Sequence, residues 1–291
     1  MINWYVFAIL SAFFGALSMI YKKKTLFKEH ATEFSTILKI FELVLMVFLL
    51  PFLGFKIGMS FNTLIFIYLI SVAVAAINIM TSKSFRHMEM SRVVPLYNLT
   101  PLFVLILAFF ILREKLTHMH LIGVLVLLVG TYILEADHNI KRLSEPFRKI
   151  VHSRYMIIFI IALVISAFET IGEKYIIANT NPVALLFFIY LFTGFNLTVY
   201  HTIMYDGFDG IIKGIKKSGK GIFLVAVFAT LSNLAWFYAI SISFVSLVLP
   251  IKRTSTLFAT IGGGKFFKEK HLLQKSIACI IMIIGAILII L

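Results

Sequence analysis

The segment Ser91-Arg92-Val93-Val94-Pro95-Leu96-Tyr97-Asn98 recurs 155 residues later as Ser246-Leu247-Val248-Leu249-Pro250-Ile251-Lys252-Arg253. The serine and the proline are identical in the two segments. Further matching residues lie at the same 155-residue spacing on both sides of the segment, without a gap. The further pairs are Leu102-Phe103 with Leu257-Phe258, Glu114-Lys115 with Glu269-Lys270, Gly130 with Gly285, Asn78 with Asn233, and Ser11-Ala12-Phe13 with Ser166-Ala167-Phe168. The chain is therefore an internal duplication, and a duplicated segment is a structural unit.

The composition indicates that lipid surrounds the chain. Hydrophobic residues make up 60% of the sequence and charged residues 14%, and the mean hydropathy is +1.00. About 20 apolar residues cross the hydrocarbon layer as a helix. The sequence predicts an all-helical membrane protein with ten spans, at 3–21, 31–53, 61–82, 90–112, 118–135, 154–178, 182–205, 221–242, 243–264 and 271–291.

Each copy of the duplication then holds five spans. Because five is odd, the second copy is inverted relative to the first, an arrangement that secondary transporters use with the substrate site at the repeat interface. We expect a first repeat at 1–136, a basic interfacial linker at 137–153 and a second repeat at 154–291.

The formal charge of +14 is distributed unevenly along the chain. Of 27 Lys and Arg residues, 20 lie in or beside the odd-numbered connections, four lie on the opposite side and three lie within spans. This is the bias of cytoplasmic loops, so it argues against nucleic-acid binding and predicts both termini outside the cytoplasm. The absence of an organelle signal favours a prokaryotic plasma membrane.

The segment from Arg86 to Phe103 with Arg113-Glu114-Lys115 resembles the EamA-type half of the drug/metabolite transporter superfamily. The shared features are Ser-x-x-x-Pro-Leu at the start of the fourth span and a Glu at its end, and Ser246, Pro250 and Glu269-Lys270 are the weaker second copy. The resemblance implies a transporter with a cavity lined mainly by spans 1, 3, 4, 6, 8 and 9. Members of this family have both termini in the cytoplasm, which is the opposite of what the Lys and Arg distribution predicts.

Lys252 and Arg253 lie near the middle of the ninth predicted span, two residues after Pro250. A charge at the membrane midplane is costly, so a functional reading is an anion site, with Arg supplying a fork of donors and Lys a point charge. The alternative is a structural pair neutralised by Glu169 or Glu42. The pair also is similar to one in the ninth helix of triose-phosphate translocators, which implies phosphate binding.

Two other groups of residues complete the predicted site. Glu169 is either a proton carrier or the counter-ion of Arg253, and Glu173 lies one turn further along, towards the outer rim. Lys39 and Glu42, three residues apart, are expected to pair on one helix face. The predicted substrate-binding residues beside Lys252 and Arg253 are Tyr97, Asn98, Asn78, Asn233 and Trp236, with Pro95 and Pro250 as paired hinges.

The sequence therefore predicts a secondary transporter that moves a small polar, anionic metabolite by alternating access. The alternative is a proton-coupled exporter of amino acids or of cationic or amphipathic compounds that uses Glu169. A flippase for lipid-linked solutes and a non-transporting scaffold rank below these. We expect no enzymatic activity, no cofactor and no metal site; the expected partners are the solute, membrane lipid and a coupled proton or counter-solute, and the sequence leaves the oligomeric state open.

Overall fold

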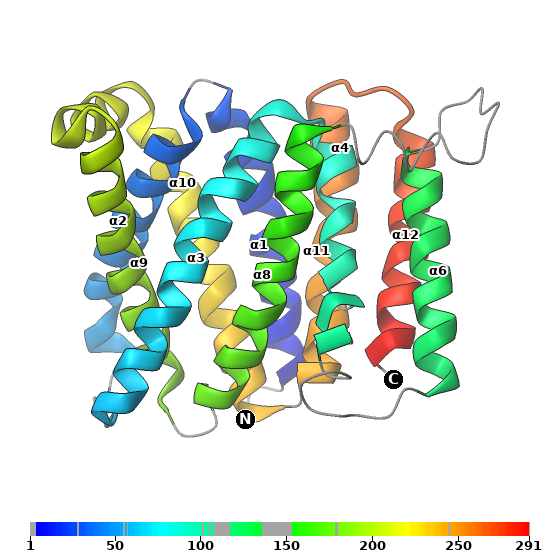
Figure 1. The fold of residues 1–291 in the computed structure, drawn as a ribbon, viewed down its shortest axis with the longest axis horizontal. Coiled ribbons are helices and arrows are strands. Elements are labelled where there is room, and N and C mark those ends of the chain that lie inside the picture. Colours follow the sequence, from blue (N-terminus) through cyan, green and yellow to red (C-terminus); the bar gives the residue numbers. More distant parts are fainter. Residues whose placement is uncertain are drawn as a thin grey trace.

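The computed structural model describes residues 4–27, 29–54, 56, 58–100, 102–104, 106–107, 117–135, 153–177, 180–243 and 245–290. These residues form a slab of roughly parallel helices in which the N and C ends lie at one edge (Figure 1). The elements are α1 (Trp4–Leu26), α2 (Ala31–Leu49), η1 (Leu50–Phe52), α3 (Phe61–His87), α4 (Met90–Val93), η2 (Pro95–Leu99), α6 (His118–Glu135), α8 (Arg154–Ile177), α9 (Pro182–Met204), α10 (Gly207–Ile242), α11 (Val245–Phe266) and α12 (Leu272–Ile290).

Six helices of the described residues are long and apolar enough to cross a membrane, namely α1, α2 with η1, α3, α8, α9 and α10. Two shorter apolar helices lie at His118–Leu134 and Leu272–Leu288. The all-helical prediction is thus confirmed for the described residues, whereas the count of ten spans stays a prediction.

The two halves of the chain interlock. Helix α1 packs against α10 and α11, α2 against α9 and α10, α3 against α8 and α9, and α6 against α12. The end of α1 and the start of α8 meet at the same end of α3, since Lys23 Nζ donates to Phe85 O at 2.5 Å and Ser84 Oγ donates to Tyr155 O at 2.8 Å. Helix α8 therefore runs opposite to α1, its counterpart 155 residues earlier (Figure 1).

The predicted fourth span differs from a continuous helix. The single turn of α4 gives way at Pro95 to the 3-10 helix η2, because proline has no N–H to donate and its ring crowds the preceding turn. Pro101, residues 108–112 of that span and the Glu114 motif lie outside the described residues.

The predicted connection at 206–220 is also different, because it is helical. Helix α10 begins at Gly207 and runs for 36 residues. Its first turns are amphipathic: Ile211 and Gly214 are buried, while Lys217 pairs with Glu29 at 3.3 Å. A side chain at Gly214 would collide with Glu33, which explains how closely this turn approaches α2.

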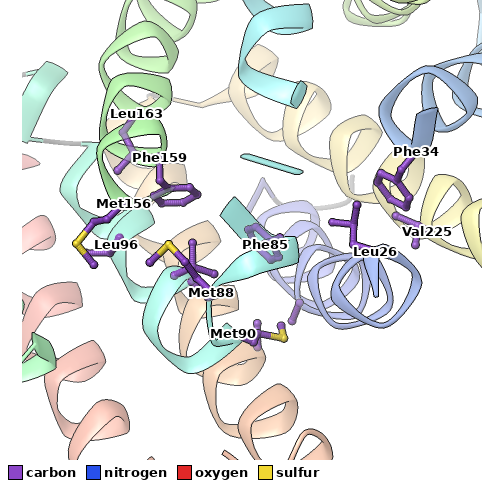
Figure 2. Close-up of a cluster of buried hydrophobic side chains, with 14 of the residues drawn as sticks. Leu26, Phe34, Phe85, Met88, Met90, Leu96, Met156, Phe159, Leu163 and Val225 are labelled. Carbon is purple, nitrogen blue, oxygen red and sulfur yellow. The ribbon is translucent and has the colours of Figure 1, made fainter. Parts of the chain in front are cut away.

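Two apolar clusters lie on either side of the bundle centre. The first joins α1, α2, α3, α4, η2, α8 and α10 at the end that carries the basic connections, with Phe34, Phe85, Met90, Leu96, Met156 and Phe159 at its centre (Figure 2). The second, at the end that carries the termini, includes Met46, Ile67, Leu185, Ile189, Tyr190, Trp236 and Phe237. The polar groups of the bundle centre consequently lie between two apolar clusters.

Candidate functional site

A cavity of about 340 Å³ lies between the two apolar clusters. Side chains from α1, α2, α3, η2, α8, α9, α10 and α11 line it, so both repeats contribute. Its volume is within the range of pockets that hold small molecules. Its charged lining residues are Lys22, Lys39, Lys252, Arg253, Glu42, Glu169 and Glu173.

Most of the residues predicted for the site converge on this cavity. Those that line it are Asn78, Tyr97, Asn233, Trp236, Lys252, Arg253, Glu169, Glu173, Lys39 and Glu42. Glu173, which was expected towards the outer rim, lies inside with Glu169. Pro95 is buried at the start of η2, and Pro250 lies within α11, its side chain being outside the described part.

Lys252 lies among aromatic and acidic groups. Its ammonium is 3.9 Å from the centre of the Trp236 ring, a cation–π contact. Glu169 and Glu173, one turn apart on α8, both interact electrostatically with Lys252. Glu169 lines the cavity, whereas the preceding Phe168 is half exposed on the surface of α8. Lys252 thus has two acidic neighbours within electrostatic range.

Arg253 occupies a different environment from Lys252. Its guanidinium is within electrostatic range of the Tyr97 hydroxyl, which faces Thr81. The Arg253 Nε atom is buried without a hydrogen-bond partner. No ion pair joins Arg253 to Glu169 or Glu42 in the described structure. A buried donor without a partner is costly, so this atom is available to a ligand acceptor.

Lys39 and Glu42 form a closed unit on α2. Lys39 Nζ is 2.5 Å from Glu42 Oε2, and both side chains are buried. The Lys39 ammonium also lies 4.8 Å from the centre of the Tyr190 ring, whose hydroxyl accepts from Asn233 Nδ2 at 3.0 Å. Glu42 is therefore the partner of Lys39 and is not the counter-ion of Arg253.

Asn98 does not line the cavity. Its side-chain amide donates to Thr256 Oγ1 at 3.2 Å and to Cys279 Sγ at 3.7 Å, and it is fully buried. Asn98 joins η2 to α11 and α12 behind the cavity wall, so the geometry assigns it to packing.

Several polar lining residues were not predicted for the site, namely Ser11, Ser18, Lys22, Thr81, Thr170, Tyr190, Ser232 and Ser255. Lys22 was counted as a loop cation because it opens the run Lys22-Lys23-Lys24, and Thr81 and Tyr190 carried no signal beyond their polarity. Spans 2 and 7 also contribute to the lining, through α2 and α9, beyond the spans that the resemblance implied. The position of α1 relative to α3, which brings Lys22 inside, depends on tertiary packing.

An inverted helical bundle with a charged central cavity is the architecture of a secondary transporter. The profile of the EamA-like transporter family matches residues 2–135 and again residues 153–291. The chain belongs to this family, and hence to the transporters of small solutes in the drug/metabolite transporter superfamily.

A structural comparison supports the same fold. A crystal structure described only as that of a protein matches with a TM-score of 0.66 at 12% sequence identity, covering 97% of this chain and 95% of that chain. A search of curated protein sequences gives no significant match.

Proposed function

We propose that this protein is a secondary transporter of a small anionic metabolite, which it moves by alternating access through the central cavity. Arg253 and the neighbouring cations bind the anion, and Pro95 and Pro250 are the paired hinges. The acidic residues Glu169 and Glu173 balance Lys252 or exchange protons. The two repeats, 1–136 and 154–291, joined by the linker 137–153, move relative to one another around the site.

The observation that carries this proposal is the unpartnered Nε atom of Arg253 beside the cavity. A buried cation without a carboxylate is unfavourable unless a ligand supplies the negative charge for part of the cycle. Arg presents several donors in a fixed fork that fits carboxylate and phosphate groups. A purely structural arginine would be expected to have a partner inside the protein.

Thermal stabilisation of the purified full-length protein in detergent tests the proposal. The panel consists of phosphorylated metabolites, carboxylates, amino acids and organic cations, because any compound that binds the folded state raises its apparent stability. We expect stabilisation by phosphates or carboxylates that is lost in Arg253→Gln. Stabilisation by anions that persists in this variant would contradict the anion site.

The second candidate function is a proton-coupled exporter of cationic or amphipathic compounds. It is favoured by the two carboxylates of α8 that face the cavity near Trp236. In that case organic cations would stabilise the protein, the effect would decrease at low pH as protons compete for Glu169, and Glu169→Gln would abolish it. Retention of cation binding in Glu169→Gln would exclude this candidate.

A further inference from the structure

We propose that the first turns of α10 bind the headgroup of an anionic phospholipid, on the outside of the bundle and away from the central cavity. Three exposed lysines, Lys213, Lys216 and Lys220, form the polar part of this site and are called the lysine stripe below. The inference does not depend on which solute the cavity takes.

The start of α10 lies level with the ends of its neighbouring helices. A Cβ atom at Gly210 would lie 3.0 Å from His201 Nε2, in the last turn of α9, and one at Gly214 would collide with Glu33, in the first turn of α2. This part of α10 lies at the edge of the slab opposite the N and C ends (Figure 1). The first turns therefore run beside the helix ends, where the lipid headgroups are, and do not project into solvent.

The exposed face of these turns carries an apolar stripe beside the lysine stripe. The apolar stripe consists of residues spaced four and three positions apart, namely Phe208, Ile212 and Ile215, with exposed fractions of 65%, 48% and 37%. Because successive residues of a helix are rotated by about 100°, Lys213 and Lys216 lie directly beside Ile212 and Ile215. An apolar face flanked by cations is typical of helices that lie in the membrane interface.

The lysine stripe has no carboxylate partner among the residues that the structure describes. Lys217, which interrupts the stripe in the sequence, is 3.3 Å from the buried Glu29, whereas the three stripe lysines form no ion pair with any described residue. The nearby exposed carboxylates, Asp206 and Asp209, are at the N-cap and in the first turn of α10, where the helix dipole favours negative charge. Asp209 is one turn from Lys213 only, and the other two lysines lie about two and three turns further along.

The lysine stripe is a feature of the second repeat alone. The positions 155 residues earlier are Gly58, Phe61 and Ile65, which carry no charge. In an inverted repeat those positions lie at the opposite face of the membrane. The duplication therefore does not require the lysines, and they occur at the face that the charge distribution assigns to the cytoplasm, where the leaflet is rich in anionic lipid.

An anionic phospholipid matches both stripes at once. Its phosphate lies at the membrane surface, within reach of lysine side chains that extend from a helix at that level. Its acyl chains continue into the hydrocarbon layer beside Phe208, Ile212 and Ile215. A soluble anion would contact the lysines and leave the apolar stripe unused, so the geometry points to a lipid.

Native mass spectrometry of the purified full-length protein tests the site. The protein is titrated in detergent with dioleoyl phosphatidylglycerol or with dioleoyl phosphatidylcholine, and the bound lipids are counted. We expect phosphatidylglycerol to bind at least about fivefold more tightly than phosphatidylcholine, since only the former has a net negative charge. The triple variant Lys213→Gln, Lys216→Gln, Lys220→Gln should weaken phosphatidylglycerol binding about tenfold and leave phosphatidylcholine binding unchanged.

Two matched variants serve as controls. Changing the exposed Lys265, Lys268 and Lys270 to Gln removes the same charge from the connection between α11 and α12, at the same end of the bundle, and should leave the affinity unchanged. Changing the lysine stripe to Arg keeps the charge and should preserve phosphatidylglycerol binding. Because the titration is made in detergent, the result does not depend on how each variant inserts into a membrane.

Four outcomes would overturn the inference. The first is equal affinity of the wild type for the two lipids, and the second is wild-type phosphatidylglycerol binding in the Gln variant of the lysine stripe. The third is an equal loss in the Lys265, Lys268 and Lys270 variant, because the preference would then belong to the basic end as a whole. The fourth is displacement of phosphatidylglycerol by millimolar inorganic phosphate, which would indicate a site for a soluble anion.

Discussion

Two neighbouring residues, Lys252 and Arg253, show how a helix divides the roles of adjacent side chains. Successive residues of an α-helix are rotated by about 100°, since there are 3.6 residues per turn. Lys252 consequently lies against Trp236 near the acidic residues of α8, whereas Arg253 lies near Tyr97 of η2. The two adjacent cations therefore have different neighbours within one cavity.

The buried ion pair of Lys39 and Glu42 yields a prediction at the residue scale. Glu42→Gln leaves the Lys39 charge buried without its partner, which costs about 3–5 kcal/mol in the free energy of unfolding. The measurement is unfolding of the purified protein, with Glu33→Gln at the start of the same helix as the control. A double change, Lys39→Met with Glu42→Leu, should recover most of the loss; a double variant no more stable than Glu42→Gln would contradict the ion-pair account.

At the scale of elements, Glu269 of the second repeat bonds to the start of a helix in the first. The Glu269 carboxylate accepts from Met90 N at 2.6 Å and Ser91 N at 2.8 Å, and also from Ser91 Oγ. These are N–H groups at the start of α4, which have no partner within a helix. The segment after α11 in the second repeat thus caps the start of α4 in the first.

Removing the Glu269 charge should loosen this contact between repeats. Glu269→Gln places an amide donor against backbone donors, and we expect a loss of about 1–3 kcal/mol in the free energy of unfolding. The adjacent exposed Lys270→Gln is the control and should leave stability unchanged. Equal stability of the two variants would show that the cap contributes nothing.

Two glycines that are related by the repeat bring α6 and α12 together. A Cβ atom at Gly285 would lie 2.6 Å from Leu127 N, and one at Gly130 would lie 3.0 Å from Met282 N. Small residues of this kind let helix backbones approach closely in membranes. Equivalent glycines of the two repeats therefore contribute to the contact between α6 and α12, one from each helix.

We expect Gly285→Ala to force α6 and α12 apart and to lower the free energy of unfolding by about 1–3 kcal/mol. Gly58→Ala is the control, because a Cβ atom there has open space around it. Ligand affinity per folded molecule should be unchanged, since α6 and α12 do not line the cavity. A stable Gly285→Ala protein would contradict the close contact.

For the whole molecule, the features that follow from local sequence pattern could be predicted from the sequence. Long apolar runs predicted α2, α6 and α9 to within a few residues, and the repeat spacing predicted the family architecture. Pro95 predicted a break in the fourth span, because its effect on the helix is local. The sequence could not predict that Lys22 would line the cavity, because that depends on how α1 packs against distant helices. The placement of Asn98 behind the wall depends likewise on α12.

The last prediction concerns the orientation of the molecule in the membrane. The connections that carry most of the cations lie at one end of the bundle, and both termini lie at the other (Figure 1). Because loops rich in Lys and Arg stay in the cytoplasm, we expect the C-terminus outside it. Alkaline phosphatase fused to Leu291 in a bacterial host should be active, and green fluorescent protein fused there should be dark. Changing the exposed Lys213, Lys216 and Lys220 to Gln weakens the charge bias and should produce a mixture of orientations. A fluorescent C-terminal fusion of the unchanged chain would instead show that the family precedent prevails over the charge distribution.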